Sequence, residues 1–455
     1  MKKITIIGGG ASGSLLAANL LRHNKDETLT INLVEKKDRI GRGVAYSTTR
    51  DCHLLNVPAS KMGAFPEDVE HFYKWLQEKN YAYQPNEFVP RKIYGEYLRE
   101  VVCNTIVNKA PNVQINIIDD EAVDIALDEQ QAQTILKSGE ILFSDQVVLA
   151  FGNFLPPDPT VENQAFAHSE KYFRNPWNSE FYEKIKADED VLIVGTGLTM
   201  VDVVLNLHAS GHRGKIYALS TRGLLPAVHQ LGHVYPSFYD ELQTQTRITD
   251  ILKIVRRHIK KAEAEGGNWR GVIDSLRPHT QEIWRNLPDA EKRYFMQHLS
   301  RYWNAARHRM PPEAAQILAE MQSRGALEIT KGRLRKIEAN ENGKFDVLYT
   351  ADGAENQLSI DAIINSIGSQ SNFRKLDAPL LVNLLASGTI NTDSLRLGLD
   401  ALPDGRTLNK IGSISQKIFT LGTALKGILW ESTAMPEIRV QANRLALDLL
   451  EQQSN

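Results

Sequence analysis

A cluster of glycines near the start of the chain has the spacing of a phosphate-binding turn. Gly8, Gly10 and Gly13 form the pattern G-x-G-x-x-G between an apolar run at 3–7 and a helical pattern at 14–21. The first glycine permits a tight turn, the second lets backbone amides approach a pyrophosphate, and the third lets the helix pack closely on the strand. The alternative is a chance glycine cluster in a loop, but the flanking strand and helix patterns favour a dinucleotide site.

An acidic residue follows the turn at the distance that such a site requires. Glu35 ends the next strand pattern, 29–34, and lies 22 residues after Gly13. A carboxylate at this point accepts hydrogen bonds from an adenosine ribose and repels a 2′-phosphate. We therefore expect FAD or NAD here rather than NADP, held by the glycine turn together with Ala11 and Ser12.

A second dinucleotide pattern begins near residue 190. Gly195 and Gly197 follow a strand pattern at 191–194, Thr199 lies in the turn, and Met200 replaces the third glycine. Met200 should keep this helix and strand further apart than at the first turn. The pattern still predicts a nucleotide site.

The strand pattern after the second turn, 215–219, is followed by Ser220, Thr221 and Arg222 and has no acid at its end. A guanidinium there can bind a 2′-phosphate that no carboxylate repels, so NADPH is favoured over NADH. The alternative is a surface arginine beside a structural turn. Two nucleotide sites on one chain predict hydride transfer from nicotinamide to flavin, which makes FAD the expected occupant of the first site.

Five further residues are expected near FAD. Arg42, in a turn-rich connection, could neutralise phosphate, and Asn56 could offer its amide to the flavin edge. A solvated arginine and a turn asparagine are the alternatives. Gly152 ends a buried strand pattern, where the backbone would return to the nucleotide. Gly422 and Thr433 belong to the last segment, in which a glycine and a helix N-terminus would suit the ribityl phosphate and the flavin.

Between about 240 and 325 the pattern is mostly helical and rich in arginine, histidine and tryptophan. Such a cluster could line a pocket for an anionic substrate, or it could be a solvated helical face over packed tryptophans. The candidate substrate-binding residues are Arg277, His279, Trp303, Arg307 and His308.

Composition and charge limit the class of protein. The 455 residues exceed one ordinary core, and the formal net charge of -2 offers no overall attraction to nucleic acid or an anionic membrane. Cys52 and Cys103 form neither a C-x-x-C pair nor a metal-ligand spacing, so no metal site is expected. No apolar run is long enough for a membrane helix, and the strand pattern close to Met1 leaves no room for a signal peptide. A cytoplasmic location is therefore expected.

The patterns predict an α/β fold with two Rossmann-like dinucleotide-binding domains, for FAD and NADPH, and a helical insert. The FAD-binding domain is expected to be discontinuous, at 1–165 and 355–455. The NAD(P)H-binding domain would occupy 166–354, with the insert at about 240–325. Three short strand patterns are expected to form a small sheet layered on the first domain: 113–118, 121–126 and 133–137.

Taken together, these residues give the chain a resemblance to known flavoproteins. The segments that carry the resemblance are 8–13, 41–46, 53–58, 195–200, 277–279, 303, 307–310, 430–434 and 436–439. The chain resembles the two-dinucleotide-binding flavoproteins, above all the YdhS-like FAD/NAD(P)-binding proteins. More distantly it resembles the class B flavin-dependent monooxygenases, which include amino-acid and amine N-hydroxylases. The resemblance implies that segment 54–62 faces the isoalloxazine, which makes Asn56 the catalytic candidate. The signature motif of Baeyer–Villiger enzymes is not found, which argues against ketone oxygenation.

The function predicted from the sequence is that of an FAD-dependent, NADPH-using oxidoreductase. Its expected form is a monooxygenase of the N-hydroxylase type, acting with O2 on a small anionic substrate. Two alternatives agree with the same residues: an NAD(P)H:acceptor reductase, and a flavin-binding sensor or scaffold without turnover. No nucleic-acid partner is expected, and the sequence leaves the substrate and the oligomeric state open.

Overall fold

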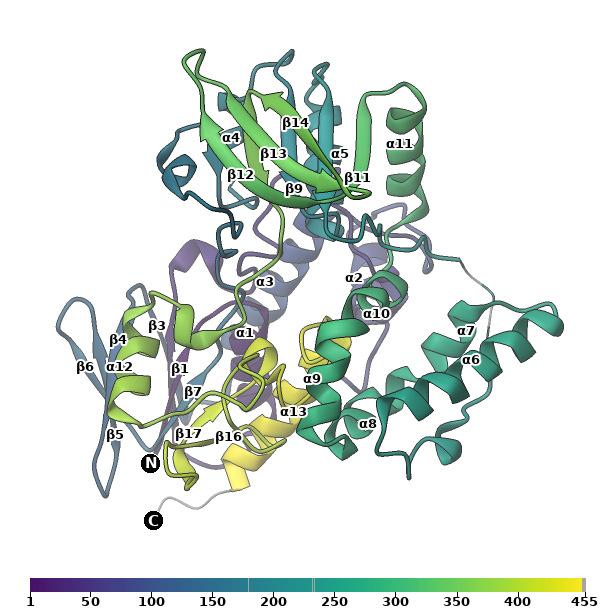
Figure 1. The fold of residues 1–455 in the computed structure, drawn as a ribbon. Helices are drawn as coiled ribbons and strands as arrows, with labels where there is room; N and C mark the ends of the chain where they lie inside the picture. The colour runs from purple at the N-terminus through teal and green to yellow at the C-terminus, as the bar shows by residue number, and fades with distance from the viewer. Residues whose placement is uncertain (179, 231, 233, 452–455) are drawn as a thin grey trace.

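The computed structural model describes residues 1–178, 180–230, 232 and 234–451. Two sheets built mainly of parallel strands form two lobes, and a group of helices lies beside them (Figure 1). The larger sheet has the strand order β16-β17-β7-β1-β2-β3. Its strands are β1 (Lys2–Ile7), β2 (Leu29–Val34), β3 (Val113–Ile118), β7 (Gln146–Leu149), β16 (Arg406–Leu408) and β17 (Ile414–Thr420).

Helices cover one face of the larger sheet. α1 (Ala11–His23) contacts both α3 (Arg91–Val107) and α13 (Met435–Glu451), and α2 (His71–Glu78) packs on α3. Their apolar side chains share one core with β1 and β2. The other face carries a helix and a three-stranded antiparallel sheet: α12 (Pro379–Ser387), β4 (Ala122–Leu127), β5 (Ala132–Leu136) and β6 (Ile141–Ser144).

The strand at 113–118 lies in a different sheet from the one expected. β3 pairs in parallel with β2, Val113 opposite Leu29, and forms an edge of the six-stranded sheet. The prediction that it belongs to the small sheet is therefore wrong. As an edge strand with one neighbour, β3 is only partly buried, and its pattern resembles that of the short strands that follow it.

The second lobe repeats the plan of the first, with five parallel strands in the order β11-β10-β9-β15-β8. These are β8 (Tyr172–Phe173), β9 (Val191–Val194), β10 (Ile216–Ser220), β11 (Leu327–Lys331) and β15 (Ala362–Asn365). One face packs on α4 (Phe181–Lys184), α5 (Leu198–Ala209) and α11 (Pro312–Ser323). The other packs on the antiparallel strands β12 (Arg333–Ala339), β13 (Phe345–Ala351) and β14 (Ala354–Ile360).

The pairing of β15 bears on where the two lobes divide along the chain. β15 lies between β9 and β8, with Ala362 opposite Val191, so the second sheet extends past residue 354. The division into 1–165, 166–354 and 355–455 stays a proposal. This pairing favours placing its second boundary after Asn365.

The chain between β10 and α11 leaves the second sheet to form the helical insertion, which we define as residues 230–309. Its helices are α6 (Ile248–Ala264), α7 (Trp269–Ser275), α8 (Thr280–Asn286), α9 (Asp289–His298) and α10 (Ser300–Arg307) (Figure 1). The two ends of the insertion meet: the amide of His229 donates to the carbonyl of Met310 at 3.0 Å, and the Met310 amide donates to the carbonyl of Ala227 at 2.9 Å. The insertion therefore starts and ends at one point.

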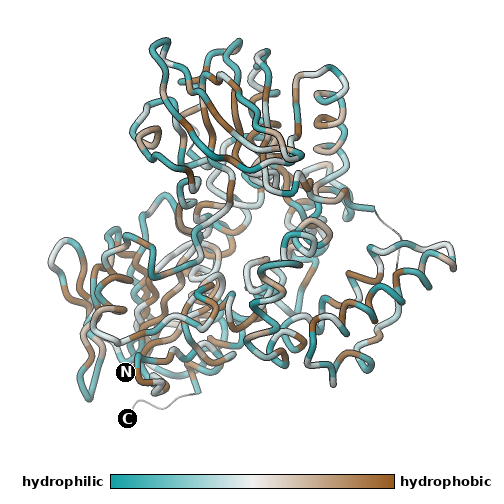
Figure 2. Tube along the Cα trace, viewed as in Figure 1, coloured by the Kyte–Doolittle hydropathy of each residue, from teal (hydrophilic) through white to brown (hydrophobic). Residues whose placement is uncertain are grey.

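Hydrophobic residues mark the strands of both lobes in Figure 2, as expected for parallel sheets covered on both faces. Within the part of the chain that the structure describes, no helix is both long and apolar enough to cross a membrane.

Candidate nucleotide-binding and active site

The first glycine turn, between β1 and α1, is packed too closely for side chains. A Cβ on Gly13 would lie 1.9 Å from the carbonyl oxygen of Gly8 and 3.1 Å from the Cβ of Ala150. Gly8 has a φ of +104°, and a Cβ on Gly10 would lie 3.3 Å from the Cα of Gly43. The turn therefore brings the N-terminus of α1 against the end of β1, the arrangement that leaves backbone amides free to hold a pyrophosphate.

Glu35 lies at the carboxyl end of β2, beside the turn. Its Oε2 accepts a hydrogen bond from the Gly9 amide at 3.1 Å, and its Oε1 accepts one from the Lys36 amide at 2.9 Å. A Cβ on Gly9 would lie 2.7 Å from the Cβ of Glu35, so the carboxylate is in direct contact with the turn. This position suits the predicted role of binding an adenosine ribose.

Three other predicted FAD residues meet at the same edge of the sheet. A Cβ on Gly422 would lie 2.8 Å from Ser12 Oγ, at the start of α1. The Thr423 hydroxyl lies 3.2 Å from the carbonyl oxygen of Gly152 and donates to the neighbouring Phe151 carbonyl at 2.7 Å. The segment after β17 is thereby tied to the end of β7, close to the first glycine turn.

Arg42 supplies a buried donor without a partner. Among the described residues, its Nε has no hydrogen-bond partner, although the side chain packs against Gly95. An orphaned guanidinium nitrogen near the start of α1 fits an anionic group of a bound ligand. The glycine cradle, Glu35 and Arg42 therefore fit the predicted FAD.

The segment that contains Asn56 is held between the two lobes. The carbonyl of Asn56 lies 2.9 Å from Nε2 of His229, at the base of the helical insertion. Burial lowers the pKa of His229 to about 4, so the ring is neutral and donates this bond. Arg91 donates to the carbonyl of Leu54 at 3.0 Å and forms a bidentate ion pair with Asp202 on α5, at 2.6 and 3.2 Å. These contacts fix the predicted flavin-facing segment against the second lobe.

A cavity of about 830 Å³ lies at the carboxyl ends of the strands in the second sheet. The second glycine turn lines it with Gly195, Gly197 and Thr199, and Arg222 lines it from the end of β10. A Cβ on Gly197 would meet no atom within 4 Å, so this turn faces open space. The facing wall includes Thr433, from the C-terminal segment that returns to the first lobe. One cavity therefore joins both halves of the predicted site.

Four basic side chains gather where this cavity adjoins a second one of about 530 Å³. Arg222, Arg301, Lys331 and Arg333 line the second cavity, and all four are exposed. Among the residues that the structure describes, none of these four forms an ion pair. The sequence indicated Arg222 alone, because the other three come from α10 and from the start and end of the β11–β12 connection. Unpaired guanidinium and ammonium groups beside a nucleotide cavity fit a 2′-phosphate.

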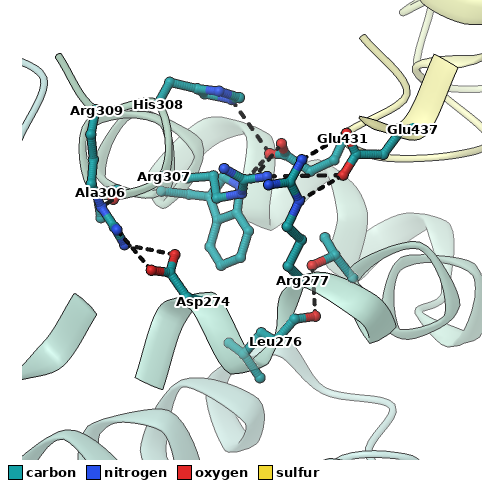
Figure 3. Close-up of polar contacts among 11 residues, drawn as sticks. Asp274, Leu276, Arg277, Ala306, Arg307, His308, Arg309, Glu431 and Glu437 are labelled. Carbon is teal, nitrogen blue, oxygen red and sulfur yellow. Dashed lines mark hydrogen bonds and ion pairs between the residues drawn. The ribbon is translucent and has the colours of Figure 1, made fainter. Parts of the chain in front are cut away.

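Glu431 lies in the wall shared by the cavity and the helical insertion, and it was not identified from the sequence. It is buried, and its φ of +68° is unusual for a residue with a side chain. Its carboxylate accepts a hydrogen bond from the Trp303 indole at 2.6 Å and lies 3.5 Å from His308 Nε2 and 3.8 Å from Arg307 Nε (Figure 3). Burial alone would raise the pKa of Glu431, but these cationic and hydrogen-bonding neighbours lower it to about 2.

The predicted anion-binding arginines already face carboxylates of the same chain. Arg277 donates two hydrogen bonds to Glu437, at 2.9 and 3.1 Å, and Arg307 lies 4.0 Å from Glu437 (Figure 3). His279 instead stacks on the ring of Tyr239, with ring centroids 4.1 Å apart. The structure thus brings Arg277 and Arg307 together but gives them partners. The structure therefore supports a structural role for both arginines, which hold the helical insertion against the start of α13. It gives less support to a role in binding an anionic substrate.

Glu431→Gln is expected to lower the free energy of unfolding at neutral pH by about 3 kcal/mol, because buried Arg307 loses its nearest opposite charge. Folding lowers the pKa of Glu431, so its stabilisation is complete above the ordinary value of 4.5 and is lost as the pH falls through about 2. Urea unfolding should therefore show the wild-type advantage shrinking between about pH 5 and about pH 2. Glu355→Gln, at an exposed position on β14, is the matched control. A difference that stays constant over this range would contradict the assignment.

Lys426 lines the large cavity beside Trp430. Its Nζ lies 5.6 Å from the indole ring, and burial lowers its pKa.

Among the described residues, no group of histidine, cysteine, aspartate or glutamate side chains could hold a metal ion.

Comparison with known proteins agrees with this geometry. Residues 5–154 match the family described as FAD-NAD(P)-binding. Nitrosuccinic acid synthase of Aspergillus oryzae is 24% identical over 262 residues. This match covers 49% of the present chain and 40% of that protein, so the chain spans less than half the length of this curated relative.

Solved structures resemble the chain over almost its whole length. The ornithine N-hydroxylase of Kutzneria sp. 744, with reduced FAD, NADP+ and L-ornithine, has a TM-score of 0.63 at 12% identity, over 99% of this chain and 98% of that one. Bacillithiol disulfide reductase of Staphylococcus aureus has a TM-score of 0.57 at 12% identity, over 99% and 100%. The predicted α/β fold is confirmed: it is the fold of flavin-dependent oxidoreductases, and the family match confirms a nucleotide-binding segment of the FAD and NAD(P) type.

Proposed function

We propose that the chain is an FAD-dependent, NADPH-using monooxygenase related to the N-hydroxylases, and that the YdhS-like proteins are its nearest group. The observation that carries this proposal is the cavity of about 830 Å³, which is lined both by the second glycine turn and by the C-terminal segment of the first lobe. A nicotinamide held by the turn would lie toward a flavin held by the first lobe. A bound FAD would supply the chemistry of accepting a hydride from NADPH and of passing electrons on to O2 or another acceptor.

In this proposal, the residues of the chain bind FAD and NADPH, orient them and enclose the space between them. The first glycine turn, Glu35 and Arg42 hold FAD, and the second turn with Arg222 holds NADPH. His229 and Arg91 keep the Asn56 segment in place from the second lobe. Trp430 and Glu431, both buried, line the cavity and would help to exclude water from the bound nucleotides.

The similarity to the ornithine N-hydroxylase supports oxygenation, and that to nitrosuccinic acid synthase agrees with it. A small-molecule substrate with O2 is therefore proposed. The anionic character predicted from Arg277 and Arg307 has less support, because both arginines are paired with glutamates. A reductase remains the second candidate, because a disulfide reductase shares the fold. The two cysteines give it little support, since Cys103 is exposed and Cys52 is only half-buried, far from it in sequence.

Rapid mixing of the purified flavoprotein separates these functions. We expect NADPH to bleach the oxidised flavin spectrum without oxygen. On mixing with oxygenated buffer, the oxidised spectrum should return slowly, through a spectrally distinct stage. Immediate return of the oxidised spectrum in the presence of substrate candidates would favour the reductase function. If NADPH never bleaches the flavin, the sensor or scaffold function would be favoured instead.

A further inference from the structure

The helical insertion encloses a cavity of about 280 Å³ that neither nucleotide motif lines. Side chains of α6, α7, α8, α9 and α10 surround it, and nearly all are apolar. The lining residues on which the argument depends are Leu252, Leu276, Arg256, Tyr302, Trp303 and Trp430. Trp430 also lines the large nucleotide cavity, so the two cavities share one wall.

The polar groups around this cavity are mostly occupied. The Thr280 hydroxyl donates to the carbonyl of Leu276 at 2.9 Å, and the Trp303 indole donates to Glu431 at 2.6 Å. The indole nitrogen of Trp430 is buried and has no hydrogen-bond partner among the described residues. Among the described lining residues Arg256 alone is charged, and it is exposed. The interior therefore offers no carboxylate to an ammonium group and no buried cation to an anion.

A space of this kind is suited to an apolar ligand. Protein interiors are close-packed, and an empty apolar cavity of this size weakens the fold. An apolar cavity of about 150 Å³ is large enough to hold benzene, so 280 Å³ has room for a substituted ring or a branched chain. A water molecule is poorly stabilised in this cavity, because it finds few hydrogen-bond partners there.

We propose that this cavity binds the body of the substrate, an aromatic ring or a branched aliphatic chain, next to the reacting end of the nucleotide cavity. The inference rests on the proposed function, since it names the substrate class for the same site. It places the apolar body on the insertion side of Trp430, the residue that lines both cavities. Small, fully charged molecules are excluded as good ligands.

The proposal can be tested by binding, without turnover. The probe is 4-fluorobenzyl alcohol, an uncharged ring, followed by fluorine NMR against the full-length FAD-loaded protein. Fluoroacetate, a small anion without an apolar body, is the comparison. We expect the ring probe to bind at least tenfold more tightly than fluoroacetate.

A matched pair of variants on α6 locates the binding. Leu252 lines the cavity, whereas Ile254, two residues further along and equally half-buried, does not. Leu252→Trp should fill the cavity and weaken the ring probe at least tenfold, and Ile254→Trp should leave its affinity within twofold. The flavin absorbance of each variant shows that it is folded.

Two results would overturn the proposal: equal affinity of the ring probe for Leu252→Trp and wild type, or tighter binding of fluoroacetate than of the ring probe. The proposed function fails separately, in the mixing experiment with NADPH. A protein that NADPH reduces but that does not bind the ring probe would refute the substrate class alone.

Discussion

Gly13→Ala is expected to yield a protein that is purified without flavin. The added methyl group would lie 1.9 Å from the carbonyl oxygen of Gly8 and 3.1 Å from the Cβ of Ala150, and both neighbours belong to the parallel sheet or its turn. Neither can move without shifting β1 or β7, so α1 must move away instead. The backbone amides at its N-terminus would then leave the position that holds a pyrophosphate. Overpacking of this kind costs about 3 kcal/mol, which is also a large part of the stability of an ordinary domain.

The measurement is the ratio of flavin released on denaturation to protein, with circular dichroism as the check that the chain is folded. Gly343→Ala is the control for a clash-free alanine. Gly343 has a φ of +75°, so alanine there carries a backbone strain that Gly13, inside α1, does not, but a Cβ at Gly343 meets no atom within 4 Å and the residue lies in a hairpin outside the site. It should keep its flavin. Stoichiometric FAD in the Gly13→Ala protein would show that the first turn is not the site.

Removal of Arg222 and Arg333 together is expected to weaken NADPH binding about a hundredfold and to leave NADH binding nearly unchanged. A hydrogen bond to a charged group contributes about 1.5–3 kcal/mol, or roughly tenfold to a hundredfold in affinity. Both side chains are exposed, so the lower figure applies to each. Arg222→Ala alone should weaken NADPH binding about tenfold. The effect should shrink as salt is added, because exposed charges are screened.

The two coenzymes are compared by titration of flavin fluorescence and by steady-state KM. Arg335→Ala is the control, since Arg335 lies on the same strand as Arg333 but does not line the cavity; its Nε lies 3.3 Å from the Thr350 hydroxyl. An equal loss for NADPH and NADH in the double variant would refute the 2′-phosphate assignment.

The spacing of residues along the chain was sufficient to predict those parts of the fold that are formed by neighbours in sequence. Gly8, Gly13 and Glu35 follow one another within a single β-α-β unit, and their contacts in the structure are the ones their spacing implies. β3 was assigned to the wrong sheet because strand pairing is a long-range property. Its half-exposed residues are typical of an edge strand, and an edge strand of either sheet would show the same pattern of burial.

The substrate side of the site depends on contacts that the sequence does not display. Arg277 is visible as a cation, but its partner Glu437 follows 160 residues later, so its neutralisation appears only in the fold. Arg301 and Arg333 likewise join Arg222 from distant parts of the chain, Arg301 from α10 within the helical insertion and Arg333 from β12 after it. Sequence patterns can identify cations, but not which of them remain unpaired.

The joined ends of the helical insertion have a consequence for how this protein could change over time. Because residues 227–229 and 310 lie side by side, the polypeptide between them can be lengthened, shortened or exchanged without re-threading either sheet. The glycine turns and the four basic side chains lie almost entirely outside it, with Arg301 as the exception. Under the proposed function, coenzyme choice and substrate choice would reside in nearly separate parts of the chain, and an exchange of this helical segment would change the substrate while leaving both glycine turns in place.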